Sequence, residues 1–266
     1  MSQPAAPDRR AEAVIIAGGV IRNPELLQFV GVDCRAMIDL LGKPMAQWTA
    51  EAVKGAQGIG RVVLIGRPDL RQTPIASAAD ELLDEGADEV ENLFRGIAAL
   101  PRADWIYMSA GDVPLVTSEA IEDLLRNAPL EADVIYPIVN MEDIEQAYPT
   151  RHLTCAKLPE GRWTGASCFL FRPAAVIENR QWVQAVFGAR RNNWQLMRMW
   201  GLGFGIRAWL GRVSIPEVEA RCSEILHLRA RAYRSRYADL CMDVDYPPDV
   251  ALIRECLKQR LAGGAS

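Results

Sequence analysis

The sequence lacks the features that mark several common classes of protein. It has two histidines in 266 residues, and its six cysteines form no Cys-x-x-Cys pair, which argues against a structural zinc site. The formal net charge is −4, so the chain as a whole offers no basic surface for nucleic acid. No apolar run approaches the length of a transmembrane helix. We therefore expect a cytoplasmic protein with reduced thiols and no nucleic-acid partner.

Short apolar runs alternate with helical patterns through the first half of the chain. They predict strands at residues 13–17, 61–66, 105–109, 133–139 and 165–172, and helices at 44–53, 91–100 and 118–127. This alternation predicts βαβ units and a mostly parallel sheet between two layers of helices, which is a Rossmann-like α/β/α fold. A loop is expected up to residue 33, a last short strand at 242–244 and a helix at 247–261. Ligands of such sheets bind beyond the carboxyl ends of the strands.

Two segments near the N-terminus are suited to bind phosphate. Ala17, Gly18 and Gly19 follow the first predicted strand, where glycines let backbone N–H groups approach an anion closely. A plain tight turn is the alternative. Arg35 supplies a cation that can pair with a triphosphate. Lys43 begins a predicted helix, or is a solvated turn residue.

Two acidic motifs indicate a metal site. Gly111 and Asp112 follow a buried strand, and a carboxylate there suits Mg²⁺, which takes one or two carboxylates together with substrate phosphates. The alternative is an aspartate that caps a turn or a helix. Asp243 and Asp245 are two residues apart, so in an extended segment both point to the same side and one of them could complete the site. Asp249 is better suited to the first turn of a helix.

The order of these motifs resembles the nucleoside triphosphate transferase family that includes molybdenum cofactor guanylyltransferase and the sugar-phosphate nucleotidyltransferases. The resemblance implies a nucleotide-diphospho-sugar transferase fold. It also implies Mg²⁺-dependent transfer of a nucleoside monophosphate from a nucleoside triphosphate to a phosphorylated small molecule, with release of pyrophosphate. The implied nucleotide-binding residues are Ala17, Gly18, Gly19, Arg22, Lys43, Asn92 and Gly111; the implied catalytic residues are Arg35 and Asp112; and the implied metal ligands are Asp112 and Asp245.

The glycine loop departs from the pattern of that family, Gly-Gly-x-Gly-x-Arg-Met. Here Val20 and Ile21 follow Gly19, Arg22 stands in for the motif arginine, and Arg35 stands where the family has a lysine. Two other functions are therefore kept. One is a metal-dependent glycosyltransferase of the GT-A type, although its Asp-x-Asp pair usually lies in the middle of the chain. The other is a catalytically weak nucleotide-binding regulatory protein, which the incomplete loop favours.

The pattern as a whole divides the chain into five parts. We expect a disordered leader at 1–10, a nucleotide-binding α/β core at 11–172, a helical insertion or subdomain at 173–230, a return to the core with a C-terminal helix at 231–261, and a flexible tail at 262–266. Within the insertion, segment 194–215 interleaves tryptophans with Arg198, Arg207 and Arg212. Four alternatives are open for this segment. It packs on the core as a helical subdomain, lines an acceptor pocket, forms a homodimer interface, or contacts a membrane surface.

Overall fold

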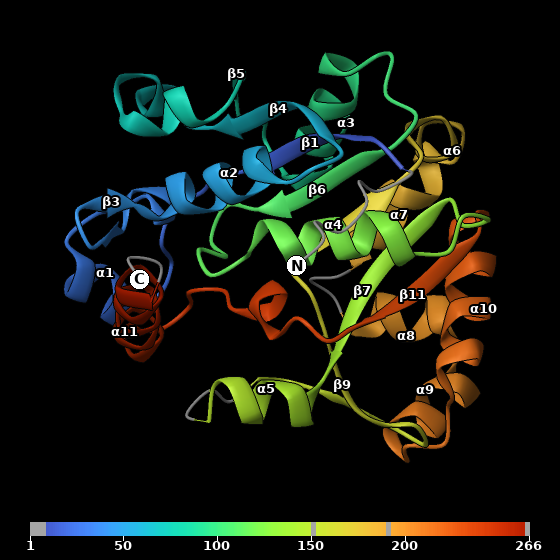
Figure 1. Ribbon diagram of the computed structural model, residues 1–266. Helices are drawn as coiled ribbons and strands as arrows, with labels where there is room; N and C mark the ends of the chain where they lie inside the picture. Colours follow the sequence, from blue (N-terminus) through green and yellow to red (C-terminus); the bar gives the residue numbers. More distant parts are fainter. Residues whose placement is uncertain (1–8, 150–152, 190–192, 264–266) are drawn as a thin grey trace, which may run out of the picture.

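The computed structural model describes residues 9–149, 153–189 and 193–263 (Figure 1). Residues 1–8 of the predicted leader (1–10) and residues 264–266 of the predicted tail (262–266) lie outside the described residues. Arg9 is buried and donates to the Ala128 carbonyl, and residues 262–263 are the last two of α11. The described strands are β1 (Ala11–Ile16), β2 (Asp39–Leu40), β3 (Lys43–Pro44), β4 (Ile59–Gly66), β5 (Glu81–Asp84), β6 (Ile106–Ala110), β7 (Val134–Asn140), β8 (Ala156–Leu158), β9 (Gly161–Gly165), β10 (Cys168–Phe171) and β11 (Ala230–Ser235). All except β2 and β3, which form a separate hairpin, belong to one sheet.

The sheet is mixed but mostly parallel at its centre. Its order is β5-β4-β1-β6-β10-β7-β9-β8, and β11 pairs with β7 as well. β1 runs parallel to β4 and β6, β4 to β5, and β11 to β7. β10 runs antiparallel between β6 and β7, and β8 and β9 continue the sheet in antiparallel pairs. The predicted fold class is confirmed, with an antiparallel strand inserted between parallel ones.

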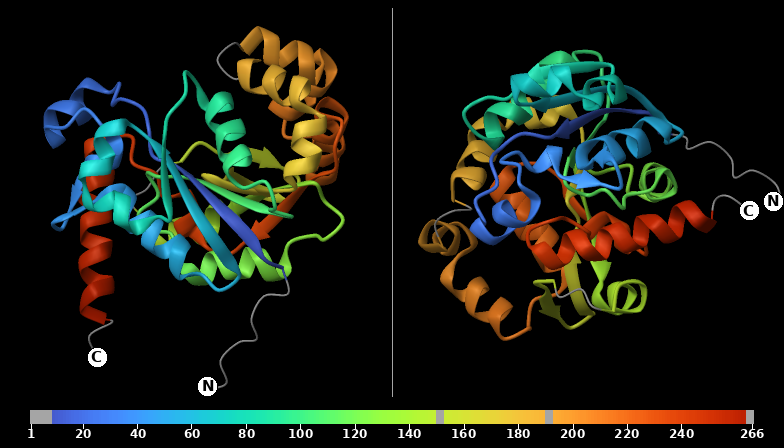
Figure 2. Two further views of the ribbon diagram at one scale, coloured as in Figure 1. Left: turned by 90° about the horizontal axis from the view of Figure 1, so that it is seen from above. Right: turned by 90° about the vertical axis from the view of Figure 1, so that its left-hand side faces the viewer.

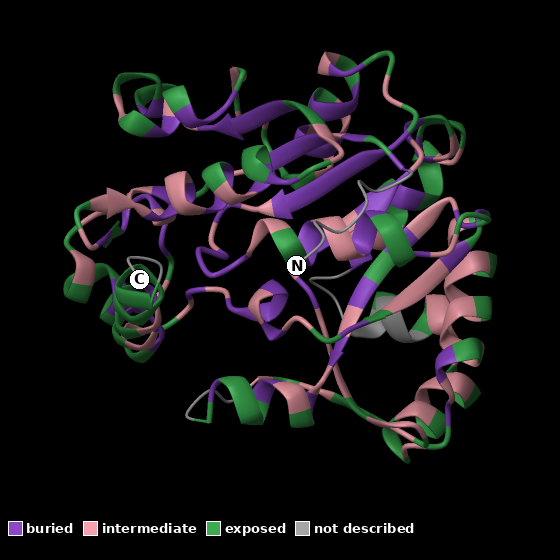
Figure 3. Cartoon of the chain, viewed as in Figure 1, coloured by how far each residue is buried: buried purple, intermediate pink, exposed green. Residues whose placement is uncertain are grey.

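Helices cover both faces of this sheet (Figure 2). They are α1 (Pro24–Val30), α2 (Met45–Gly55), α3 (Glu89–Ala99), α4 (Ser118–Asn127), α5 (Met141–Ala147), α6 (Pro173–Glu178), α7 (Arg180–Ala189), α8 (Asn193–Trp200), α9 (Leu202–Trp209), α10 (Ile215–Leu226) and α11 (Pro247–Gly263). One core lies between the sheet and α2, α4 and α11, and the other between the sheet and α3, α6 and α7. Alternate residues of β1 serve the two cores: Ala13 and Ile15 face the first and Val14 faces the second. The strands at the centre of the sheet are accordingly buried (Figure 3).

Gly96 allows α3 to approach β1 closely. A Cβ atom at this position would lie 2.8 Å from both γ-methyl groups of Val14, within the second core. We expect Gly96→Ala to lower the free energy of unfolding by about 1–3 kcal/mol, because overpacking outweighs the better helix propensity of alanine. Gly188→Ala is the matched control, since Gly188 lies in α7 with open space around it. Urea unfolding measures both, and equal stabilities of the two variants would contradict the prediction.

The loop expected up to residue 33 was a wrong prediction, because α1 occupies Pro24–Val30. The Asn23 side chain accepts hydrogen bonds from the backbone N–H groups of Glu25 and Leu26, and Pro24 stands at the start of the helix. Gly31 ends the helix with φ 72°. These residues are the usual signals for the start and end of a helix, but α1 has only seven residues and buries only Leu26, so its apolar pattern is weak.

The last strand was also predicted in the wrong place. Residues 242–244 are irregular, although Met242 and Val244 are buried, and the strand is β11 at Ala230–Ser235. Arg231 and Arg234 interrupt β11, so its sequence lacks the apolar run of a buried strand. Its register comes from the full parallel pairing with β7. The other strands and helices predicted up to residue 127 lie within two residues of the observed ends.

Candidate functional site

The Arg35 guanidinium lies between two carboxylates from distant parts of the chain. Its Nη1 is 2.7 Å from Asp112 Oδ2 and 2.9 Å from Asp245 Oδ1. Arg35 begins a short 3₁₀ helix at Arg35–Met37, Asp112 follows β6, and Asp245 precedes α11. The structure thus brings together the three residues on which the predicted chemistry depends.

The adjacent ends of β1 and β6 hold Asp112 in place. The Gly111 N–H donates to the Ile16 carbonyl over 2.8 Å, which joins the residues that leave the two parallel strands. A Cβ at Gly111 would lie 3.0 Å from the Ala17 side chain, so a larger residue would press on the first glycine loop. The Gly111 carbonyl also accepts a hydrogen bond from Thr49 of α2. The glycine in Gly-Asp therefore allows close packing at the carboxyl end of the sheet, as expected for a ligand site in this fold.

Asp245 is fixed by the residues around it. Its own N–H and that of Tyr246 both donate to Asp249 Oδ2, over 3.0 and 2.8 Å. Asp249 is buried at the start of α11, as predicted for a carboxylate of the first helical turn. The Asn23 side chain donates to the Asp245 carbonyl, which ties the segment before α1 to the C-terminal segment. Neither Asn23 nor Asp249 was predicted to belong to the site.

Burial and ion pairing act in opposite directions on the charges of this cluster. Burial raises the pKa of Asp112, and the nearby Arg35 cation opposes that shift. Burial also disfavours the charge of Arg35, but its ion pairs with Asp112 and Asp245 are stronger and leave the Arg35 pKa above its ordinary value. The arginine therefore limits the rise in the Asp112 pKa that burial causes.

The Gly-Gly loop is closed in this structure by an acidic side chain. The Gly19 N–H donates to Glu85 Oε2 over 2.8 Å, and Gly19 has a φ of 88°. Gly18 is needed for this contact, since a Cβ there would lie 1.8 Å from the same oxygen. Asn92, which is buried in α3, accepts from the Gly86 N–H and so holds the segment that carries Glu85. The Glu85 carboxylate thus accepts a hydrogen bond from the Gly19 N–H, which the sequence pattern predicts to bind phosphate.

Val20 and Ile21, which replace residues of the family's glycine loop, are bonded to the segment before Arg35. Val20 pairs with Cys34, and the Ile21 N–H donates to the Asp33 carbonyl over 2.7 Å. Ile21 is buried where the family has its third glycine. The backbone N–H of Ile21 is therefore already bonded within the protein.

Two of the predicted phosphate-binding cations lie apart from the cluster. Lys43 forms an ion pair with Glu51 of α2, and its Nζ lies 4.0 Å from the centre of the Trp48 ring. Arg22 is exposed and has no ion pair within the described part of the chain. The structure therefore places Arg35, and neither Lys43 nor Arg22, against the two aspartates.

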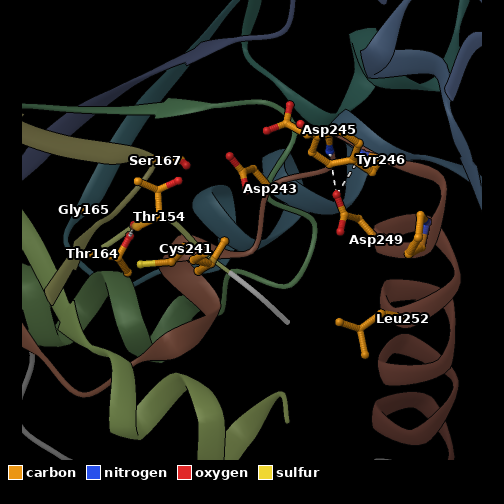
Figure 4. Close-up of a pocket in the computed structure, with 12 residues that line it drawn as sticks. Thr154, Thr164, Gly165, Ser167, Cys241, Asp243, Asp245, Tyr246, Asp249 and Leu252 are labelled. Carbon is orange, nitrogen blue, oxygen red and sulfur yellow. Dashed lines mark hydrogen bonds between the residues drawn. The ribbon is translucent and has the colours of Figure 1, made fainter. Parts of the chain in front are cut away.

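A pocket of about 520 Å³ opens beside Asp245 (Figure 4). Among the described residues, its lining includes three carboxylates, four hydroxyl side chains and a thiol, and no arginine, lysine or histidine: Leu153, Thr154, Thr164, Gly165, Ser167, Cys241, Asp243, Asp245, Tyr246, Pro248, Asp249 and Leu252. Burial raises the pKa of Cys241, which keeps that thiol protonated. The lining therefore suits a ligand with hydrogen-bond donors, and Cys241 is a poor nucleophile.

The carboxylate pair fits a divalent cation in one respect. Asp112 and Asp245 both reach the same nitrogen of Arg35, so a cation at that point already meets two carboxylate oxygens. No group of three or more histidine, cysteine, aspartate or glutamate residues with metal-site geometry occurs in the described ranges. Two protein carboxylates are within the number that Mg²⁺ takes when waters and substrate phosphates supply its other ligands.

The structure is an α/β fold in which the Arg35 cluster lies beside the ends of β1 and β6. Residues 13–203 match the MobA-like NTP transferase domain family. Because this match covers more than half of the chain, the protein belongs to that family. No helix in the described ranges is long and apolar enough to cross a bilayer.

Similar proteins extend the comparison. A solved structure described as a hypothetical transferase from Thermus thermophilus is 31% identical, covers 91% of this chain and 99% of its own, and has a TM-score of 0.81. The 2-C-methyl-D-erythritol 4-phosphate cytidylyltransferase of Trichodesmium erythraeum is 28% identical over 48% of this chain, and the match spans 64% of that relative. A CMP:2-keto-3-deoxy-manno-octonic acid synthetase complexed with CTP is 18% identical with a TM-score of 0.58, over 94% of this chain and 99% of its own, which shows a shared fold.

Proposed function

We propose that this protein is a nucleotidyltransferase that moves a nucleoside monophosphate from a nucleoside triphosphate to a phosphorylated small molecule and releases pyrophosphate. The observation that carries the proposal is the Arg35 cation between Asp112 and Asp245, at the carboxyl ends of parallel strands and beside a pocket. Family membership supports it independently. The hydroxyl and carboxylate lining of the pocket favours an acceptor that bears hydroxyl groups next to its phosphate.

The roles of the residues follow from where they lie. Gly18 and Gly19 present the loop to the nucleotide, and Arg35 supplies the positive charge for its phosphates. Asp112 and Asp245 would hold Mg²⁺, which when bound neutralises phosphate charge and brings the donor and acceptor phosphates together. The acceptor phosphate is already anionic at neutral pH and needs no general base to attack. This agrees with a cluster built from arginine and aspartate without histidine.

A pyrophosphate-release assay tests the proposal. The protein is incubated with Mg²⁺, each of the four ribonucleoside triphosphates, and a panel of phosphorylated sugars and polyols. CTP is tested first, because the similar proteins named above are a cytidylyltransferase and a synthetase solved with CTP. We expect pyrophosphate only when both the triphosphate and an acceptor are present. Turnover of a nucleotide sugar without pyrophosphate would support a glycosyltransferase, and tight binding without pyrophosphate for any acceptor would support a regulatory protein.

The position of Arg35 predicts competition with the metal. In the wild-type protein a metal ion has to displace the Arg35 guanidinium from the carboxylates, whereas Arg35→Met leaves Asp112 and Asp245 side by side without a cation. We expect 10 mM Mg²⁺, as an order-of-magnitude dose, to raise the Tm of Arg35→Met by about 3–5 °C and that of the wild type by less. Thermal unfolding without nucleotide measures this difference.

A double variant serves as the control for that experiment. Adding Asp245→Asn to Arg35→Met removes one of the two carboxylates and should abolish the extra stabilisation by Mg²⁺. Equal Mg²⁺ responses in the wild type and Arg35→Met would show that the carboxylate pair is not the metal site.

A further inference from the structure

The helix α9 presents most of its apolar side chains to solvent. Leu202, Ile206, Trp209 and Leu210 are 64, 50, 85 and 48% exposed, and no residue of the helix is buried. We call these four side chains the α9 patch. The Trp209 indole, at 85% exposure, is unusually exposed for a folded protein in water. The other three members of the patch, which are close to it in the sequence, are aliphatic.

The spacing of the α9 patch makes it one face of the helix. Residues 202, 206, 209 and 210 follow the i, i+4, i+7, i+8 pattern that places side chains on one side. The glycines at 203 and 205 have no atom within 4 Å of where a Cβ would stand, so nothing in the described chain packs over them. The face is thus continuous and accessible.

The charge of the surrounding sequence has one sign. Residues 179–216 include six arginines and no lysine, aspartate or glutamate. The segment carries a formal charge of +6 in a chain whose net charge is −4, so all the other residues together carry −10. A cationic segment of this length in an acidic protein indicates an anionic partner for this part of the surface.

Two acidic residues that come before and after this segment, Glu160 and Glu217, are bonded within the protein. Glu217 pairs with Arg207 and accepts from both the N–H and the hydroxyl of Ser214. Glu160 accepts from the Ile215 N–H through Oε1. Arg198 and Arg212 are exposed and form no ion pair within the described ranges. Positive charge therefore remains available on both sides of the α9 patch in the sequence.

The place of α9 in the molecule leaves the nucleotide site uncovered. Figures 1 and 2 show α8, α9 and α10 along one side of the protein, far from α1 and α11. Asn23 and Asp245, which flank α1 and α11, belong to the candidate site. A surface that covered the α9 patch would therefore not block the Arg35 cluster.

We propose that the α9 patch docks on the surface of a bilayer that contains anionic phospholipid. The four apolar side chains would enter the interface between headgroups and acyl chains, where tryptophan is favoured, and Arg198 and Arg212 would meet lipid phosphates. A second copy of this chain is a poorer partner, because a two-fold interface through this face would bring its arginines close to those of the other copy. This inference does not depend on the reaction proposed above.

Co-sedimentation with vesicles tests the proposal. The full-length protein is mixed with vesicles of phosphatidylcholine alone, or with about 30% phosphatidylglycerol, a proportion chosen to give a negative surface potential of the kind that attracts basic segments. We expect binding to the anionic vesicles and little to the neutral ones. Trp209→Ala should weaken binding about tenfold or more by removing buried apolar area. Arg198→Gln and Arg212→Gln should each weaken it about fivefold.

Exposed residues elsewhere provide the matched controls. Leu130→Ala removes an apolar side chain that is 69% exposed, and Arg102→Gln removes an exposed cation; both lie outside the insertion and should leave binding unchanged. Because Trp209 packs on little, Trp209→Ala should keep the wild-type Tm. Failure of the wild type to bind anionic vesicles, or equal losses in the controls, would overturn the proposal. A concentration-dependent dimer in light scattering that Trp209→Ala abolishes would overturn it in favour of a second copy.

Discussion

Asp112→Asn is expected to lower kcat/KM for nucleotidyl transfer by at least about a hundredfold, the size of effect seen when one preorganised charge-stabilising group is removed. The substitution keeps the shape of the side chain but removes one of the two carboxylates that share the Arg35 Nη1. Arg35 retains Asp245, and burial already raises the pKa of Asp112, so a neutral side chain fits the position. We therefore expect a folded protein with a near-normal Tm and very little pyrophosphate release.

The control for this variant lies at the other end of the same strand. Asp104→Asn changes an exposed aspartate just before the amino end of β6, whereas Asp112 follows its carboxyl end. Turnover should be unchanged in this control. If Asp112→Asn retained Mg²⁺-dependent turnover with every nucleotide, Asp112 would have no role in the reaction.

The second large effect is expected at Glu85, where removal of a charge should improve nucleotide binding. The Glu85 carboxylate accepts from the Gly19 N–H in the protein without nucleotide. A triphosphate that uses this donor has to displace the carboxylate and overcome its negative charge. We expect Glu85→Gln to tighten binding of the triphosphate about three- to tenfold, which corresponds to about 0.6–1.4 kcal/mol. Isothermal titration with CTP and Mg²⁺ measures the change.

Gly18→Ala separates loss of the Glu85 charge from access to the Gly19 N–H. Its methyl group would fill the position of Glu85 Oε2, where a phosphate oxygen bonded to the Gly19 N–H would also lie. We expect Gly18→Ala to weaken triphosphate binding, and to weaken it also when combined with Glu85→Gln, because the methyl group blocks the donor itself.

Glu131→Gln controls for overall charge in the Glu85 experiment, since Glu131 is exposed and precedes the amino end of β7, away from the ligand end of the sheet. Weaker nucleotide binding by Glu85→Gln would show instead that Glu85 contacts the nucleotide directly, for example through ribose hydroxyl groups.

The central sheet could be predicted from the sequence because its strands are strongly apolar and their ends carry glycine. β1, β4 and β6 each coincide with such a run, and the parallel order follows from the helices between them. The same reasoning placed Ala17 and Asp112 at the carboxyl end of the parallel strands, where they are found. β11 was missed because arginines interrupt it, and its pairing with β7 joins residues about 100 positions apart.

The contacts within the site were harder to predict than its position. The sequence gives no sign that Arg35 pairs with both aspartates at once, since this depends on how the 3₁₀ helix turns the side chain. Glu85 follows β5, a short strand at the sheet edge, and its approach to Gly19 spans 66 positions. Such contacts depend on tertiary packing, and local patterns carry no information about them.

The bond between Arg35 and Asp245 also bears on how the protein is made. The two residues are 210 positions apart. A chain growing on the ribosome can form the Arg35–Asp112 pair once Asp112 has emerged after β6, but Asp245 emerges much later. The hydrogen bond from the Asn23 side chain to the Asp245 carbonyl also cannot form until that segment has been made. Nascent chains therefore carry an incomplete site, and premature termination before α11 yields a protein that has the glycine loop but lacks one of its two proposed metal ligands.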